Sequence, residues 1–179
     1  MNAGILQGFI WRLGDMNVRG SLLSRRAWLA TSMLLVTTVA LMHVSSFLDL
    51  PAEQLTAHQP PALLVERALA IVGAGGRVRL KAHNGLDCLQ LTEACAQAMA
   101  VIMGLRLRGE GHAQAASGML VGAKTMRMTR AVKTGDVVEV SATQTAELGP
   151  LQLYEVSASV GDEVILTGEL KVVRTGGPA

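Results

Sequence analysis

The sequence predicts an α+β domain in which an antiparallel sheet surrounds one long central helix. Residues 87–104 form the most apolar helix-like segment outside the N-terminal region. Two strand-like segments precede this helix, and only strand-like segments joined by short turns follow it. Strands joined by hairpin turns pair antiparallel, and a helix that is apolar on nearly all sides is normally buried.

A basic segment and a long apolar segment precede the domain. Residues 1–26 contain four arginines and one acidic residue, and residues 27–48 carry no formal charge. As a helix, the apolar segment would extend about 33 Å, enough to cross a bilayer core of about 30 Å. It is either a membrane anchor or export signal, or an appendage created by a start codon placed too early, since Met42 lies just upstream of the domain.

The domain itself is expected over residues 49–175, followed by a tail at 176–179. Residues 63–72 are predicted as a strand, residues 73–76 as a glycine-rich turn, and residues 77–82 as a second strand. The second strand alternates cationic and apolar residues, which is typical of a strand with one exposed and one buried face. These segments predict a hairpin ahead of the helix.

The central helix has a clear start and end. Asp87 is a favourable N-cap residue, and Gln90 three positions later completes a capping-box pattern. The helix is expected to end near 106–108, before Gly109, because cations favour a helix C-terminus. The later strands are predicted near residues 118–128, 137–142, 151–158 and 163–173.

Composition narrows the function. The net charge is only +2, and no basic patch is interleaved with aromatic residues, so nothing supports nucleic-acid binding. Cys88 and Cys95 are seven residues apart in one predicted helix. That spacing corresponds to about 10 Å, which is too far for a disulfide. Two cysteines are also too few for a zinc site, and both are expected to be small core residues.

Glu93 and Gln97 stand out in the apolar helix. A lone carboxylate is costly to bury without a purpose, and Gln97 lies one turn later on the same face. The residues alone leave two interpretations of Glu93 open. It is either a functional carboxylate or a polar residue near a helix start, where the helix dipole favours it.

Four segments resemble, in order, motifs of the β-hydroxyacyl-acyl carrier protein dehydratases. They are His-Gln-Pro-Pro-Ala-Leu-Leu-Val-Glu-Arg at 58–67, Leu-Gln-Leu-Thr-Glu-Ala-Cys-Ala-Gln-Ala at 89–98, Gly-Met-Leu-Val-Gly-Ala-Lys at 118–124 and Val-Lys-Thr-Gly-Asp at 132–136. The chain is similar in particular to the divergent, ApeP-like branch found in aryl-polyene-type biosynthetic clusters. This resemblance implies the hot-dog fold, in which an antiparallel sheet wraps a long central helix.

The resemblance also implies an activity and a site. Such enzymes are dimers that dehydrate 3-hydroxyacyl thioesters on acyl carrier protein, or hydrate the products, without a metal or cofactor. A histidine after the second strand and a helix glutamate meet across the dimer interface, and the matching residues are His83 and Glu93. Gln97 matches a supporting glutamine, and the backbone amide of Cys88 stands where the family binds the thioester carbonyl at the helix N-terminus.

Two alternatives share the same fold. In a hot-dog acyl thioesterase, a helix carboxylate would direct water at the thioester, whereas a non-catalytic hot-dog subunit would dimerise with an active relative. The dimer is expected to contain two copies of this chain or a second hot-dog chain. Because acyl carrier protein is cytoplasmic, the domain is expected in the cytoplasm. Anchoring to the inner membrane through residues 27–48 is the alternative, although the preceding arginines would then send the domain outward.

Overall fold

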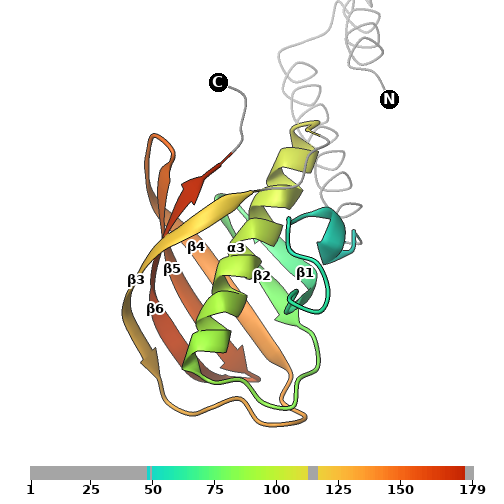
Figure 1. The fold of residues 1–179 in the computed structure, drawn as a ribbon, viewed down its shortest axis with the longest axis vertical. Coiled ribbons are helices and arrows are strands. Elements are labelled where there is room, and N and C mark those ends of the chain that lie inside the picture. Colours follow the sequence, from blue (N-terminus) through green and yellow to red (C-terminus); the bar gives the residue numbers. More distant parts are fainter. Residues whose placement is uncertain (1–47, 49, 113–116, 176–179) are drawn as a thin grey trace, which may run out of the picture. The chain divides into compact units, whose positions relative to one another are not determined.

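The structure, a computed structural model, describes residues 48, 50–112 and 117–175. The predicted basic segment 1–26, all but the last residue of the predicted apolar helix 27–48, and the tail 176–179 lie outside this description. The elements, in chain order, are η1 (Ala52–Gln54), β1 (Val65–Val72), β2 (Gly75–Leu80), α3 (Cys88–Gly109), β3 (Gly118–Met128), β4 (Val138–Leu148), β5 (Leu151–Val160) and β6 (Glu163–Arg174) (Figure 1).

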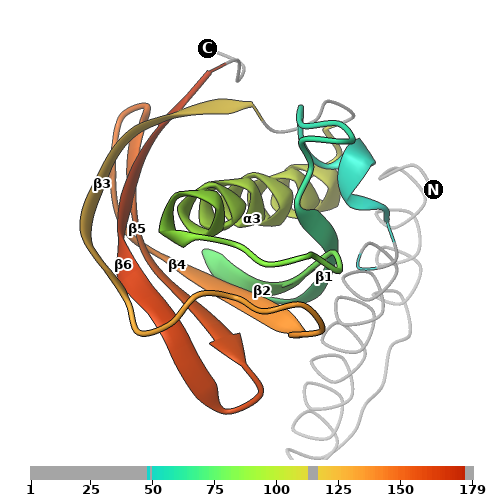
Figure 2. The same ribbon diagram turned by 60° about the horizontal axis from the view of Figure 1, so that its bottom comes forward.

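One six-stranded sheet curves around α3. Its strand order is β1-β2-β4-β5-β6-β3, and every neighbouring pair is antiparallel. Figure 2 shows the sheet wrapping the helix, with β3 at one edge and β1 at the other. The predicted fold class, an antiparallel sheet around one central helix, is confirmed.

The core lies between the concave face of the sheet and α3. The helix contributes fully buried side chains such as Leu91 and Ile102, and the sheet contributes Val78, Val140 and Leu170. Among the described residues, α3 is the one helix long and apolar enough to cross a membrane, but 67% of its most apolar 18-residue window is buried inside the domain. Its apolar character is therefore that of a core helix.

The predicted start of α3 is confirmed in atomic detail. The backbone N–H of Gln90 donates to Asp87 Oδ1 at 2.8 Å, and the backbone N–H of Asp87 donates to Gln90 Oε1 at 3.0 Å. These two bonds form the capping box. The helix runs through Gly109, one residue beyond the predicted end near 106–108, and Arg106 and Arg108 lie in its last turn as expected.

The turn before β2 is shorter than predicted. Gly75 and Gly76 belong to β2 and pair with β1 and β4, which leaves only residues 73–74 between the strands. A Cβ atom on Gly75 would lie 2.5 Å from the carbonyl oxygen of Ala142 on β4. Glycine is therefore required at position 75 by the close approach of the two strands.

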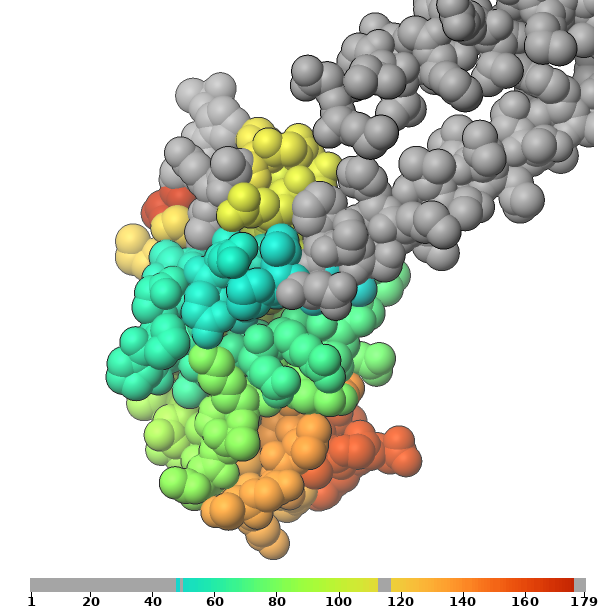
Figure 3. All heavy atoms as spheres, turned by 90° about the vertical axis from the view of Figure 1, so that its right-hand side faces the viewer, coloured from blue at the N-terminus to red at the C-terminus, as the bar shows by residue number. Residues whose placement is uncertain are grey.

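The segment ahead of β1 packs against the C-terminal half of α3. Leu55, just after η1, is fully buried, and a Cβ atom on Gly104 would overlap its carbonyl oxygen and lie 2.8 Å from its carbonyl carbon. Figure 3 shows this segment, in cyan to teal, on the surface below the yellow end of α3. The contact positions the residues that follow Leu55, which reach the candidate site.

Candidate active site

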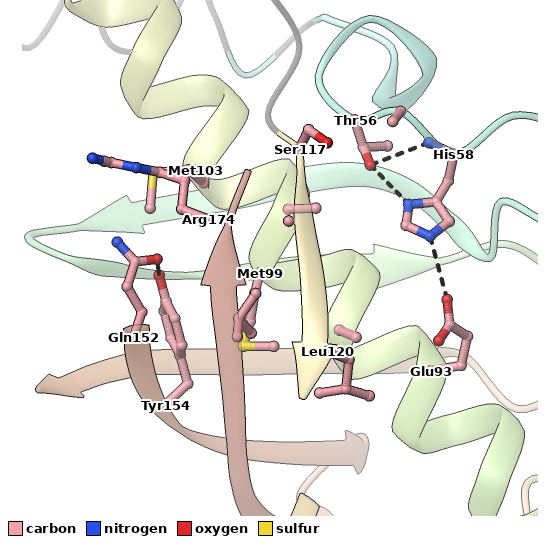
Figure 4. A pocket seen from close by; sticks show the side chains of 15 residues that line it. Thr56, His58, Glu93, Met99, Met103, Ser117, Leu120, Gln152, Tyr154 and Arg174 are labelled. Carbon is pink, nitrogen blue, oxygen red and sulfur yellow. Dashed lines mark hydrogen bonds and ion pairs between the residues drawn. The ribbon is translucent and has the colours of Figure 1, made fainter. Parts of the chain in front are cut away.

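A pocket of about 130 Å³ lies between α3, the segment ahead of β1 and strands β3, β5 and β6. Figure 4 shows His58 and Glu93 at one side of it, Met99 in the middle, and Tyr154 with Arg174 at the other side. These residues come from four separate parts of the chain. Only the folded domain brings them together.

Glu93 presents its carboxylate to this pocket from the second turn of α3. Its side chain is 45% exposed in the single chain, so the carboxylate is accessible rather than sealed in the core. Oε1 lies 3.4 Å from His58 Nε2 and accepts a hydrogen bond of 3.0 Å from Gln97 Nε2. Among the described residues, no hydrogen bond or ion pair is made by Oε2, which leaves that oxygen available to a ligand.

His58 is oriented by a buried threonine. Thr56 is 1% exposed, and its hydroxyl lies 3.0 Å from His58 Nδ1. The same hydroxyl oxygen accepts a bond of 3.4 Å from the backbone N–H of His58. With Nδ1 held by Thr56, the ring directs Nε2 toward Glu93 (Figure 4). Thr56, His58 and Glu93 therefore form a connected acid–base arrangement.

Gln97 links the Glu93 carboxylate to the chain ahead of β1. Its side chain is 1% exposed, and its amide nitrogen donates to Glu93 Oε1 and, at 2.9 Å, to the carbonyl oxygen of Ala62. Its amide oxygen accepts a bond of 2.7 Å from the backbone N–H of Leu64. Gln97 therefore lies one turn from Glu93 on the same helix face and is hydrogen-bonded to it, and its supporting role stays a prediction.

Replacing Gln97 by Leu is expected to lower the free energy of unfolding by about 2 kcal/mol, because it leaves the Leu64 N–H and Ala62 carbonyl without their partner. Urea unfolding followed by far-UV circular dichroism measures the change. Gln90→Leu in the exposed capping box is the matched control, and its expected loss is about 0.5–1 kcal/mol. Equal losses for the two variants would contradict the role given to Gln97.

His83 lies three residues after β2 and does not line the pocket that holds Glu93. Its Nε2 is buried and has no hydrogen-bond partner among the described residues, and burial lowers the pKa of its imidazole. Within one chain the structure brings His58, not His83, to Glu93. Because the predicted contact of His83 with Glu93 spans two subunits, the role of His83 stays a prediction.

The two cysteines have different surroundings. Cys95 is buried as expected, and burial together with the nearby Cys88 raises the pKa of its thiol to about 12. For Cys88 the expectation of a core residue is wrong, since it is exposed at the first position of α3, where the helix emerges from the domain. Cys88 does not line the pocket in the single chain, and the proposed use of its backbone amide stays a prediction.

His58 is the site residue that sequence reasoning did not select. It belongs to the segment 58–67 that carries the family resemblance, but this resemblance assigns no catalytic role to the histidine. Its distance of 35 positions from Glu93 gives no local periodicity that could have paired the two. The one feature of the sequence that could have identified this residue is the position of a histidine two residues before Pro60, within the resembling segment.

The wrapped sheet, the central helix and the pocket along that helix define a hot-dog protein. Solved structures with this fold are similar to the chain. The dehydratase heterocomplex ApeI:P from Xenorhabdus doucetiae matches with a TM-score of 0.66 and 21% identity, over 71% of this chain and 92% of that chain. A sigma28-regulated virulence protein from Campylobacter jejuni matches with a TM-score of 0.55 and 14% identity, over 76% and 92%. An uncharacterized protein from Pyrococcus horikoshii matches with a TM-score of 0.52 and 20% identity, over 72% and 96%.

At these identities the structures establish the fold. The family is established by a sequence model, ApeP-like (ApeP dehydratase), which matches residues 50–177. The chain therefore belongs to the ApeP-like dehydratase family, and the resemblance identified in the sequence is confirmed. No curated protein matches it.

Proposed function

We propose that this chain dehydrates 3-hydroxyacyl thioesters carried by acyl carrier protein, in fatty-acid or polyene-type biosynthesis. The observation that carries the proposal is the contact between Glu93 and His58 at the pocket, in a member of a dehydratase family. No metal or cofactor enters this proposal.

Dehydration of such a substrate requires one base and one acid. A proton leaves C2, the C3–O bond breaks, and the hydroxyl departs as water after it has received a proton, which leaves a 2-enoyl thioester. His58 Nε2 and Glu93 Oε1 face each other at 3.4 Å and can share one proton between them. When Glu93 holds that one proton on Oε2, it protonates the leaving hydroxyl while His58 Nε2 removes the C2 proton. The free Oε2 of Glu93 is the atom we assign to that hydroxyl.

The middle of the pocket suits an acyl chain. Met99 and Leu120 lie between the catalytic pair and the opposite side (Figure 4). Val172 also lines the pocket. Apolar lining keeps bulk water from the reacting carbons and strengthens the electrostatic interactions of the acid–base pair. The thioester would then lie near Glu93 with its acyl chain along α3.

We further propose a hot-dog partner at β3. This strand is one of the two edge strands of the sheet, and Met119, Leu120 and Val121 on it are exposed. An apolar, 11-residue edge strand is a template for pairing with another chain. Leu120 also lines the pocket, so a partner strand at β3 would close it. The similar structure from Xenorhabdus doucetiae is a dehydratase heterocomplex, and the partner here is either a second copy or a related chain.

Acyl carrier protein is cytoplasmic, so this function requires the domain to be on the cytoplasmic side. We propose that location. Digestion of the domain by a protease added outside the inner membrane of intact cells would contradict it.

Separate alanine substitutions of the two histidines test which one pairs with Glu93. His58→Ala is expected to lower kcat/KM for formation of the enoyl thioester by about a hundredfold, because it removes one member of the acid–base pair. The assay measures enoyl thioester by mass spectrometry, with the partner chain supplied if the protein is inactive alone.

His83→Ala is the comparison in the same assay. A loss confined to His83→Ala would transfer the catalytic role to His83 and contradict the role assigned to His58. His112→Ala is the matched control, because His112 is exposed beyond the end of α3 and lies outside the pocket. Release of free thiol instead of water would favour the thioesterase. The non-catalytic subunit would be favoured if activity appeared only after addition of a partner with its own catalytic pair, and if neither histidine substitution changed that activity.

A further inference from the structure

The pocket has a second polar end, which the acid–base chemistry does not use. The whole pocket is lined along one face of α3 by Glu93, Met99 and Met103. Met103 lies ten residues after Glu93 in the helix. At 1.5 Å per residue the pocket therefore follows the helix for about 15 Å. At the end near Met103, Figure 4 shows Gln152, Tyr154 and Arg174 gathered across the apolar middle from His58 and Glu93.

Two of these polar side chains are almost completely buried. Gln152 and Tyr154 are each 3% exposed, and the Tyr154 hydroxyl donates to Gln152 Oε1 at 3.1 Å. That bond occupies the amide oxygen, and a hydrogen bond from the NH₂ group lowers the pKa of Glu147. One N–H of Gln152, which can only donate, is left for a ligand. A buried donor group at the wall of a pocket is matched best by an acceptor on the ligand.

Around this end of the pocket, two arginines accompany one carboxylate. Arg106 and Arg174 face one carboxylate, Glu147, whose pKa is lowered by hydrogen bonds from Gln144 and Gln152 and by the two arginines. Within the described part of the chain, neither arginine lies within ion-pair distance of a carboxylate. The Arg106 guanidinium donates to Oε1 of the neutral Gln144 at 3.5 Å. Arg174 is exposed at the pocket mouth and is left to interact with a ligand.

We propose that Arg174 and Gln152 bind an anionic oxygen group of the ligand whose thioester lies at Glu93. This inference rests on the proposed function for the position of the thioester. Two parts of such a ligand carry the required chemistry. One is a carboxylate at the far end of the acyl chain, and the other is the phosphate of the phosphopantetheine arm of the carrier. A guanidinium and an amide N–H recognise either through charge-assisted hydrogen bonds.

Three synthetic thioesters of the same 3-hydroxyacyl chain separate these sources. The first is a neutral N-acetylcysteamine thioester, the second is the same molecule with a terminal carboxylate on the acyl chain, and the third is the 4′-phosphopantetheine thioester. For the wild-type protein, kcat/KM is expected to be about tenfold higher for either the carboxylate-bearing thioester or the phosphopantetheine thioester than for the neutral one. The thioester that is preferred identifies the group that binds.

Arg174→Met is expected to abolish that preference, since methionine retains an apolar stem without the charge. Arg67→Met, at an exposed arginine on β1 that does not line this pocket, is expected to retain it. Equal kcat/KM values for all three thioesters in the wild type, or an unchanged preference in Arg174→Met, would overturn the proposal.

A binding measurement keeps this test independent of catalysis. Calorimetric titrations compare a long-chain dicarboxylic acid with the matching monocarboxylic acid, and 4′-phosphopantetheine with pantetheine. Tighter binding of one charged ligand that is lost in Arg174→Met supports the subsite even if no dehydration is found. The absence of any such difference overturns the subsite even if dehydration is found.

Discussion

Replacing Glu93 by Gln is expected to lower kcat/KM for dehydration about a thousandfold. The amide keeps the size of the side chain and an oxygen that can accept from Gln97, but it cannot take up or release a proton at the required moment. General acid–base catalysis contributes about 10²–10⁴-fold to such reactions. The rate of enoyl thioester formation, measured together with the thermal unfolding midpoint, separates lost chemistry from lost structure.

Glu110→Gln is the matched control, since Glu110 is the exposed C-cap of the same helix and lies outside the pocket. It is expected to retain wild-type turnover. If Glu93→Gln lost less than tenfold while its unfolding midpoint stayed unchanged, Glu93 would not be the catalytic carboxylate.

Gly104→Ala is expected to destabilise the domain by about 2–3 kcal/mol and to impair dehydration as well. Alanine favours a helix over glycine by about 1 kcal/mol. Here the added Cβ would overlap the backbone of Leu55, which is fully buried and cannot give way without moving its neighbours. Overpacking of this kind typically costs about 1–3 kcal/mol, and a clash with backbone belongs at the upper end of that range. Because Thr56 and His58 follow Leu55 directly, the shift is expected to draw His58 away from Glu93.

Gly109 supplies a control at the end of the same helix. A Cβ atom there meets nothing within 4 Å, so Gly109→Ala is expected to be neutral or to stabilise the domain by up to about 1 kcal/mol. Chemical denaturation of both variants, with turnover measured where each is fully folded, makes the comparison. Equal stability of the two variants would show that the Leu55 contact does not constrain the helix.

The architecture could be predicted because its signals are local. Alternation of cationic and apolar residues predicts the strand at 77–82, and Asp87 with Gln90 predicts the first turn of α3, which the structure confirms as a capping box. The predicted turn before β2 is too long, because Gly75 and Gly76 belong to β2 and pair with β1 and β4. A pair of glycines predicts a turn when only the neighbouring residues in the sequence are considered.

The candidate site could be predicted only in part. Glu93 and Gln97 lie one turn apart on the same helix, so their pairing follows from helical geometry, and the structure shows the bond. His58 reaches Glu93 through the packing of Leu55 against Gly104, a tertiary contact that leaves no local pattern. Cys88 was expected in the core because its helix is apolar, yet the first position of a helix is also where side chains emerge into solvent.

The central claim, that the pair of Glu93 and His58 removes water from a carrier-bound 3-hydroxyacyl chain, has one direct test. The purified full chain, alone and mixed with a related hot-dog chain whose own catalytic residues have been substituted, is incubated with a 3-hydroxyacyl-acyl carrier protein. Intact-protein mass spectrometry then follows the acylated carrier. The expected product is a carrier that keeps its acyl group and loses one water. A carrier that loses the whole acyl group, or one that stays unchanged under both conditions, would contradict it.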